Sequence, residues 1–196
     1  MNKEFRRKLV HILIGLIAFL FIYFDKVIVS LIIVFLLSSA LIANKFPKIY
    51  NYIIREKELR LGLLLGVITY TSSMLLLTLM FDPRIASAGI IALAWGDGFA
   101  SILGRHGKLK IHGTKTIEGS LSMLTFSFIG SLIALSIIPY ANSIISAPIQ
   151  LSFYSIIIAS IISSLLAAIA ELYTEHDNIS VPLTQAISLS ILLNLL

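Results

Sequence analysis

The stretch IASAGIIALAWGDGFASILG, Ile85 to Gly104, combines a membrane-like composition with one carboxylate, Asp97. Small residues recur at every fourth position of this stretch, at Ala88, Ala92, Gly96, Ala100 and Gly104. Residues with this spacing share one face of an α-helix, and small ones let a neighbouring membrane helix pack closely. Asp97 lies on the adjoining stripe, so close packing would direct its side chain into a helical bundle. Ionisable groups inside a membrane are costly and are candidates for functional sites.

The rest of the sequence indicates an integral membrane protein. Of its 196 residues 58% are hydrophobic and 13% are charged, whereas a soluble domain is about one quarter charged. The mean hydropathy is +0.97, and the apolar blocks are of a length that crosses a bilayer. We predict about seven transmembrane helices, at residues 9–24, 27–43, 61–81, 85–103, 120–138, 151–173 and 181–196. Because no polar linker interrupts them, residues 1–196 are expected to form one all-α polytopic membrane bundle, a single integral-membrane catalytic domain.

The distribution of positive charge predicts the orientation of this bundle. Thirteen of the fifteen Lys and Arg residues fall in the N-terminal segment and in the loops after the second and fourth predicted helices. Only Lys26 and Arg84 fall on the opposite side. The positive-inside rule therefore predicts a cytoplasmic N-terminus. The net charge of +5 follows from this topology and requires no nucleic-acid partner. We expect a multi-pass protein of the cell membrane whose active site faces the cytoplasm.

The loop RHGKLKIHGTKTIEGS, Arg105 to Ser120, has the composition of a phosphate-binding segment. Its cationic residues are Arg105, Lys108, Lys110 and Lys115, and its glycines, with the one just before it, are Gly104, Gly107, Gly113 and Gly119. Glycines let backbone N–H groups approach a phosphate, and cations neutralise its charge. The sequence Glu118-Gly119-Ser120 then opens a helix, whose N-terminal dipole also favours an anion. The alternative is a basic loop that only sets the topology.

Acidic residues near the same face predict a divalent-cation site. In the sixth predicted helix Ser164, Ala168, Glu171 and Glu175 share one face, and Asp177 and Asn178 follow it. The carboxylates of Asp97, Glu118, Glu171, Glu175 and Asp177 could converge on Mg²⁺, which is usually held by carboxylates together with substrate phosphates. Structural alternatives are an ion pair or hydrogen bond for Asp97, and helix capping before Pro182 for Asp177 and Asn178. His11 lies about one turn inside the first predicted helix and is a further candidate.

Four motifs, in order, resemble those of one enzyme family. The segment RRKLVHILIG, Arg6 to Gly15, is similar to its R-R-K-x-x-H-x-x-x-G signature, and AWGDGFASILGRHG, Ala94 to Gly107, to its G-D-x-x-A-x-x-x-G-R-x-x-G element. The segment KTIEGS, Lys115 to Ser120, resembles K-T-x-E-G-S, and EHDNISVPL, Glu175 to Leu183, resembles D-N-x-x-x-P. The family is that of the CTP-dependent lipid-alcohol kinases, which includes dolichol kinase, phytol kinase and the yeast-type diacylglycerol kinase. It is distantly related to the phosphatidate cytidylyltransferases.

The resemblance implies transfer of the γ-phosphate of CTP to the hydroxyl of a membrane alcohol, with a divalent cation such as Mg²⁺. The matched residues are His11, Asp97, Arg105, Lys115, Glu118, Asp177 and Asn178. We assign catalysis to Asp97, Asp177 and His11. Phosphate binding is assigned to Arg105 and Lys115 with Gly104, Gly107, Gly119 and Ser120. Metal binding is assigned to Asp97, Glu118, Glu171 and Asp177, with Glu171 placed there by helical geometry alone.

The expected substrate is an isoprenoid alcohol of the polyprenol or dolichol type. Phytol, geranylgeraniol and diacylglycerol also bring a hydroxyl to the interface and remain alternatives. A rival function is a phosphatidate cytidylyltransferase-like CDP-lipid synthase, against which the absence of that family's long C-terminal acidic signature argues. A membrane transporter is a third possibility, but its polar groups would be expected at the midplane between two repeated halves. No feature of the sequence assigns an oligomeric state.

Overall fold

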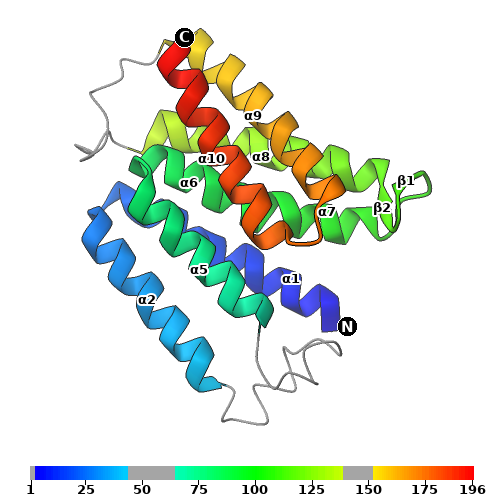
Figure 1. The fold of residues 1–196 in the computed structure, drawn as a ribbon, viewed down its shortest axis with the longest axis horizontal. Helices are drawn as coiled ribbons and strands as arrows, with labels where there is room; N and C mark the ends of the chain where they lie inside the picture. Colours follow the sequence, from blue (N-terminus) through cyan, green and yellow to red (C-terminus); the bar gives the residue numbers. More distant parts are fainter. Residues whose placement is uncertain (1–2, 44–64, 139–151) are drawn as a thin grey trace.

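The computed structural model of the protein describes residues 3–43, 65–138 and 152–196 (Figure 1). Its helical elements are α1 (Lys3–Ile14), η1 (Gly15–Ile22), α2 (Lys26–Ala43), α5 (Leu65–Met80), α6 (Pro83–Ile91), η2 (Ala92–Gly96), α7 (Asp97–Gly104), α8 (Ile117–Ile137), α9 (Phe153–Tyr173) and α10 (Asp177–Leu195). A short antiparallel hairpin, β1 (Lys110–His112) and β2 (Lys115–Thr116), lies between α7 and α8. The basic segment 44–60 lies outside the described residues.

The described helices confirm the all-α class and a multi-pass membrane protein. Four of them are long and apolar enough to cross a membrane: Pro83–Gly104, Ile117–Ile137, Phe153–Tyr173 and Asp177–Leu195. The apolar helices Lys26–Ile42 and Leu65–Met80 are shorter. The first of the four is built from α6, η2 and α7 in direct succession. The count of seven spans and the orientation in the membrane stay predictions.

Local chemistry sets several of the helix boundaries. Asp82 caps α6, because its Oδ1 accepts the backbone N–H of Arg84 at 2.9 Å and Pro83 occupies the first turn. Helix α10 begins at Asp177, four residues before the predicted start, and Pro182 lies inside it. The first predicted span also differs from the structure: it begins as α1 and continues from Gly15 as the 3₁₀ helix η1.

The predicted small-residue stripe is confirmed as a packing surface against α8. A Cβ added at Gly96 would come within 2.7 Å of Met123 Sδ, and one added at Gly104 within 2.9 Å of the Gly119 Cα. Ala88, Ala92 and Ala100 are also buried. Helix α8 thereby packs along the whole Pro83–Gly104 helix and contacts α9 on its other side.

A buried polar cluster joins α8, α9 and α10. The Nε2 amide of Gln185 donates to Ser131 Oγ at 2.6 Å and to Ser163 Oγ at 3.0 Å, and none of the three side chains is exposed. Hydrogen bonds of this kind join helices in an apolar bundle, because polar side chains buried there cannot hydrogen-bond to water instead. The cluster fixes the relative rotation of the helices that carry the candidate site.

The polar ends of several helices meet at one end of the bundle. Figure 1 shows the start of α1, the β1–β2 hairpin and the turn between α9 and α10 toward the right of the molecule, with the C-terminus at the opposite end. The start of α5 is tied to the same region, because the Asn178 side chain at the start of α10 donates to the Gly66 carbonyl at 3.1 Å and to Thr69 Oγ1 at 3.0 Å. The motifs that are far apart in the sequence therefore lie at one end.

Candidate functional site

A pocket of about 430 Å³ opens at this end of the bundle. Its wall includes six of the residues predicted to bind phosphate, together with the carboxylate of Glu171. These lining residues are Gly104, Arg105, Gly107, Lys115, Gly119, Ser120 and Glu171. Lys110, Thr114, Thr116, Ala100, Ser101 and Glu4 complete the wall. The pocket is thus bounded by the end of α7, the hairpin, the start of α8, the end of α9 and the start of α1.

Thr116 joins the two helices that frame the pocket. Its Oγ1 accepts the backbone N–H of Gly119 at 3.2 Å, which caps the N-terminus of α8, and donates to the Gly104 carbonyl at 3.0 Å, at the end of α7. The helices can approach this closely because Gly104 and Gly119 face each other without side chains. The N-terminus of α8 is therefore held at the pocket, where its dipole favours an anion.

Glu118 braces the loop that precedes the hairpin. Its Oε1 accepts the backbone N–H of Lys108 at 2.9 Å, and its Oε2 has no hydrogen-bond partner among the described residues. A Cβ at Gly107 would meet Thr116 Cβ at 2.8 Å, so glycine is the residue that fits there. Glu118 is absent from the pocket wall described above. Its hydrogen bond to Lys108 directs its side chain to the backbone of the loop.

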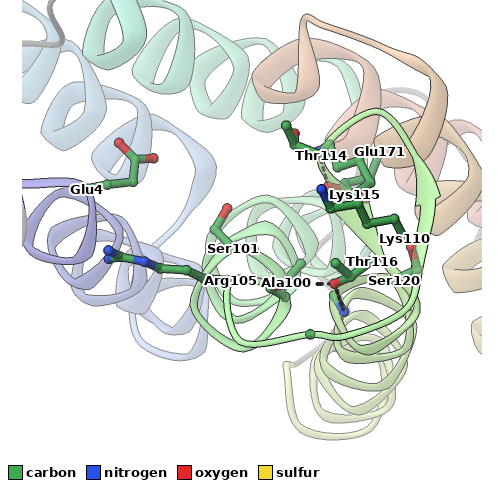
Figure 2. A pocket seen from close by; sticks show the side chains of 13 residues that line it. Glu4, Ala100, Ser101, Arg105, Lys110, Thr114, Lys115, Thr116, Ser120 and Glu171 are labelled. Carbon is green, nitrogen blue, oxygen red and sulfur yellow. Dashed lines mark hydrogen bonds and ion pairs between the residues drawn. The ribbon is translucent and has the colours of Figure 1, made fainter.

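Lys115 and Glu171 form an ion pair across the pocket, although they lie far apart in the sequence. Figure 2 shows their side chains meeting beside Thr114, near Lys110, whereas Arg105 extends toward α1 and the side of the pocket where Glu4 lies. Cationic groups therefore flank the pocket on both sides. An elongated polyanion lying across it would meet positive charge at each end.

Asp97 is completely buried and lies on α7 about one helical turn before Ala100 and Ser101, which line the pocket. Its Oδ2 forms an ion pair with the ammonium group of Lys8 on α1, which is 2% exposed, while its Oδ1 has no hydrogen-bond partner among the described residues. The predicted inward direction of Asp97 is confirmed. A buried carboxylate with one satisfied oxygen retains capacity to accept a further donor or a cation.

Other residues of the first motif hold α1 in place around this pair. His11 Nδ1 lies 3.1 Å from the Arg7 carbonyl, its Nε2 lies 3.5 Å from Arg7 Nη1, and its ring packs 4.2 Å from that of Tyr70. The Tyr70 hydroxyl in turn donates to the His11 carbonyl at 2.8 Å. His11 therefore lies in a structured contact between α1 and α5, outside the pocket wall.

The backbone around Asp97 departs from a regular α-helix. A π-helical turn, η2, ends at Gly96, directly before Asp97. Such turns inside α-helices occur frequently at functional sites, because the inserted residue redirects the side chains that follow. Gly98 serves a different purpose, since a Cβ there would come within 2.6 Å of Ile12 Cγ1. Its lack of a side chain lets α1 approach α7 and bring Lys8 to Asp97.

The second half of the predicted site lies at the start of α10. Asp177 is the first residue of that helix, and Asn178 ties it to α5 through the two hydrogen bonds given above. Ser164, Ala168 and Glu171 share a buried face of α9 as predicted, but Glu175 is exposed because α9 ends at Tyr173.

The structure brings the predicted phosphate-binding residues together more closely than the predicted metal ligands. Within residues 3–43, 65–138 and 152–196, no group of three or more His, Asp or Glu side chains is arranged to hold a metal ion. The carboxylates of Asp97 and Glu171 are each paired with a lysine, and Glu118 faces the loop.

Two participants were missed by reasoning from the sequence. Lys8 was counted as one of the cations that set topology, yet it is the buried partner of Asp97. Its position three residues before His11 in the first motif was the available signal. The segment Arg105 to Ser120 was described only as a loop, whereas it contains two short paired strands that carry Lys110 and Lys115, both of which line the pocket.

Comparison with known proteins adds evidence that is independent of this geometry. The chain is 32% identical over 200 aligned positions to a protein named probable phytol kinase 1, chloroplastic, from Glycine max; the match covers 90% of this chain and 63% of the plant protein. It is 32% identical over 145 positions to an uncharacterized protein of Methanocaldococcus jannaschii, covering 66% of this chain and 74% of that protein. No family model matches the chain, and no solved structure matches it. The chain therefore belongs to one family with the archaeal protein and is a distant homologue of a probable phytol kinase, a member of the CTP-dependent lipid-alcohol kinase family.

Proposed function

We propose that this protein is a CTP-dependent kinase that phosphorylates the hydroxyl of a membrane isoprenoid alcohol. The observation that carries the proposal is the pocket itself: it places three cations, Arg105, Lys110 and Lys115, around the N-terminus of a membrane helix. Such a pocket suits a nucleotide triphosphate at the end of a bundle, where a lipid hydroxyl can reach it. The homologous plant protein is named a probable phytol kinase, which supports an isoprenoid alcohol as acceptor.

The proposed reaction is a phosphoryl transfer between two oxygens. The alcohol oxygen forms a bond to the γ-phosphorus, the bond from that phosphorus to the β-phosphate oxygen breaks, and CDP leaves while the hydroxyl proton is released. Such transfers depend on positioning and charge neutralisation more than on covalent chemistry with the protein. We assign the neutralising charges to Arg105 and Lys115, and the close backbone approach to Gly104, Gly107 and Gly119, with the Ser120 hydroxyl beside them.

The Lys115–Glu171 pair gives the pocket a way to accept the nucleotide. A triphosphate offers Lys115 a more highly charged partner than Glu171 does, so Lys115 would turn to the phosphates and release the carboxylate. The released Glu171 would face a site that contains several phosphate oxygens. This exchange would couple nucleotide binding to the exposure of a carboxylate that is paired in the structure described here.

The residues present fit Mg²⁺ only together with the nucleotide. Mg²⁺ is commonly bound by one or two carboxylates plus substrate phosphates, so a preformed cluster of three acids is not required. We propose Glu171, on the pocket wall, as the main protein ligand. Asp97 with its unpartnered Oδ1, Asp177 and Glu118 are further candidates. The ion would neutralise charge on the phosphates.

Two carboxylates are candidates for accepting the hydroxyl proton. Asp97 is enclosed and paired with Lys8, whereas Asp177 lies at the start of α10 and is only partly buried. We therefore propose Asp177 as the general base, Asp97 as the fixed negative charge beneath the site, and His11 as a residue that positions Arg7 and α1.

A panel assay tests this function. Purified protein would be incubated with phytol, geranylgeraniol, a polyprenol, dolichol or diacylglycerol, each with γ-labelled CTP, ATP, GTP or UTP. We expect label in a lipid monophosphate with an isoprenoid alcohol and CTP, and its loss when EDTA removes divalent cations. Transfer from all four nucleotides at equal rates would contradict the CTP preference, and labelling of diacylglycerol alone would contradict the isoprenoid acceptor.

The proposed location is the cell membrane, with the pocket facing the cytoplasm. The sequence contains no cysteine, so single cysteines can be introduced without background. Lys108→Cys lies in the loop before the hairpin, and Tyr23→Cys lies at the turn between η1 and α2 at the other end. A membrane-impermeant maleimide applied to intact cells should label Tyr23→Cys and spare Lys108→Cys. The reverse pattern would invert the orientation.

A further inference from the structure

A second hollow, an apolar groove of about 260 Å³, lies directly beside the phosphate pocket. It runs between α8 and α9 and is bounded at one end by β1. Its walls include Ile111, Leu121, Leu124, Leu165, Ala168 and Leu172. Leu121 and Leu165 are 62% and 47% exposed, so the groove is open along its side. In a membrane-spanning bundle such an opening faces the lipid.

Three separate elements divide the pocket from the groove in the same way. On β1, Lys110 lines the pocket and Ile111 lines the groove, as expected for successive residues of a strand. On α8, Gly119 belongs to the pocket and Leu121 to the groove. On α9, Glu171 belongs to the pocket and Leu172 to the groove. The two hollows are therefore the polar and apolar halves of one continuous surface.

Ser120 is the residue at the boundary, since it lines both hollows. Its Oγ is buried and has no hydrogen-bond partner among the described residues. Buried hydroxyl groups in proteins are almost always hydrogen-bonded. An alcohol group placed at the boundary could donate to this oxygen or accept from it. None of the other residues that line the groove has a polar side chain.

We propose that the groove between α8 and α9 holds the isoprenoid chain of the substrate alcohol and delivers its hydroxyl past Ser120 to the phosphates. This inference rests on the proposed kinase function and adds to it the path by which the lipid reaches the site. A single aliphatic chain fits a groove with aliphatic walls that opens sideways to the membrane. The substrate would enter laterally from the lipid, while the nucleotide would enter from the aqueous end.

Two neighbouring leucines of α9 provide a matched pair of variants. Leu165 lines the groove, whereas Leu166 does not line it and is 40% exposed on α9. Leu165→Trp fills the groove, and Leu166→Trp places the same bulk elsewhere on the lipid-facing surface. We expect Leu165→Trp to raise the KM for geranylgeraniol by about tenfold or more, the size of effect that a steric mismatch produces in an apolar site. The KM for CTP and the rate with a short, soluble prenol should be unchanged, and Leu166→Trp should behave as wild type.

A photoaffinity experiment provides a readout that does not depend on turnover. A geranylgeraniol analogue with a diazirine at the end of its tail would be bound to the wild-type protein in lipid nanodiscs, irradiated, and mapped by peptide mass spectrometry. We expect labelling of residues 121–124 and 165–172, competed by unlabelled geranylgeraniol and weakened in Leu165→Trp. Labelling that is spread evenly over the lipid-facing helices, without competition, would overturn the groove assignment.

The two readouts separate this inference from the proposed function. If the wild-type protein transfers phosphate and the two tryptophan variants have equal KM values for geranylgeraniol, the groove assignment is overturned and the kinase stands. If the protein transfers no phosphate to any alcohol but the groove is labelled with competition, the kinase proposal fails and the groove is retained as a prenyl-chain site.

Discussion

Two lysine–carboxylate pairs in this molecule differ in how far the lysine is exposed to solvent. Lys8 and Asp97 are 3% and 1% exposed at their side chains, and the pair joins α1 to α7. Lys115 and Glu171 are 31% and 5% exposed, and the pair joins the hairpin to α9 in the pocket wall. The first pair is enclosed and cannot exchange partners without opening the bundle. The second has a lysine that a ligand can reach, so it can open when a polyanion binds.

Breaking the enclosed pair should give the largest change in stability. Lys8→Met removes the partner of a fully buried carboxylate and should destabilise the fold by about 3–5 kcal/mol, because a buried charge is left uncompensated. Thermal unfolding in detergent, followed by the fluorescence of the only tryptophan, Trp95, measures the effect. An unfolding midpoint equal to that of the wild type would contradict a structural role for this pair.

Breaking the accessible pair should instead give the largest change in activity, at a smaller cost in stability than Lys8→Met. Lys115→Met removes a cation from the nucleotide site and should lower kcat by about 10²–10³-fold, the typical effect of losing one group that stabilises transition-state charge. The free energy of unfolding should fall by less than in Lys8→Met, because Glu171 borders the pocket, where water can reach the carboxylate that has lost its partner.

Lys108→Met is the control for this variant, since Lys108 lies in the same loop but is absent from the pocket wall. It should retain nearly full activity. Equal losses in the Lys115 and Lys108 variants would show that only the overall charge of the loop matters.

A double variant separates the structural role of Asp97 from its role in the site. Lys8→Met combined with Asp97→Asn removes both charges, so the stability lost in Lys8→Met should largely return. Activity should remain about 10²-fold below wild type if the Asp97 charge acts on the reaction. Recovery of both stability and activity would show that Asp97 serves only as the structural partner of Lys8 and has no role in the reaction.

The smallest expected change concerns Glu118. If this residue braces the loop through Lys108, Glu118→Gln should keep a carbonyl acceptor and change the KM for CTP by less than about tenfold. The dependence of the rate on Mg²⁺ concentration should be unchanged. A large rise in the Mg²⁺ concentration needed for half-maximal rate would instead identify Glu118 as a metal ligand.

The parts of this molecule that could be predicted from sequence are those set by local spacing. The apolar blocks predicted α8 and α9 within three residues at each end, and the small-residue stripe predicted both the buried face and the direction of Asp97. The residues predicted to bind phosphate line one pocket because they all belong to one short segment of the sequence, from Gly104 to Ser120. The prediction that Glu175 continues the Glu171 face of the sixth helix was wrong, because that helix ends at Tyr173.

The parts that could not be predicted depend on contacts between distant helices. Counting charges shows which side of the membrane Lys8 belongs to, but its burial depends on how α1 crosses α7 at Gly98. The pairing of Lys115 with Glu171 likewise depends on the hairpin reaching across to α9. The groove forms where β1, α8 and α9 meet, and the residue spacing within any one of these elements does not predict it.

Identification of the products is the most direct test of the central claim. Purified protein would be given geranylgeraniol and, separately, phosphatidate, each with doubly labelled CTP and Mg²⁺. A lipid-alcohol kinase should yield CDP and geranylgeranyl monophosphate carrying the γ-phosphate, with no reaction of phosphatidate. Pyrophosphate together with a CDP-lipid would contradict the account and assign the pocket to cytidylyl transfer.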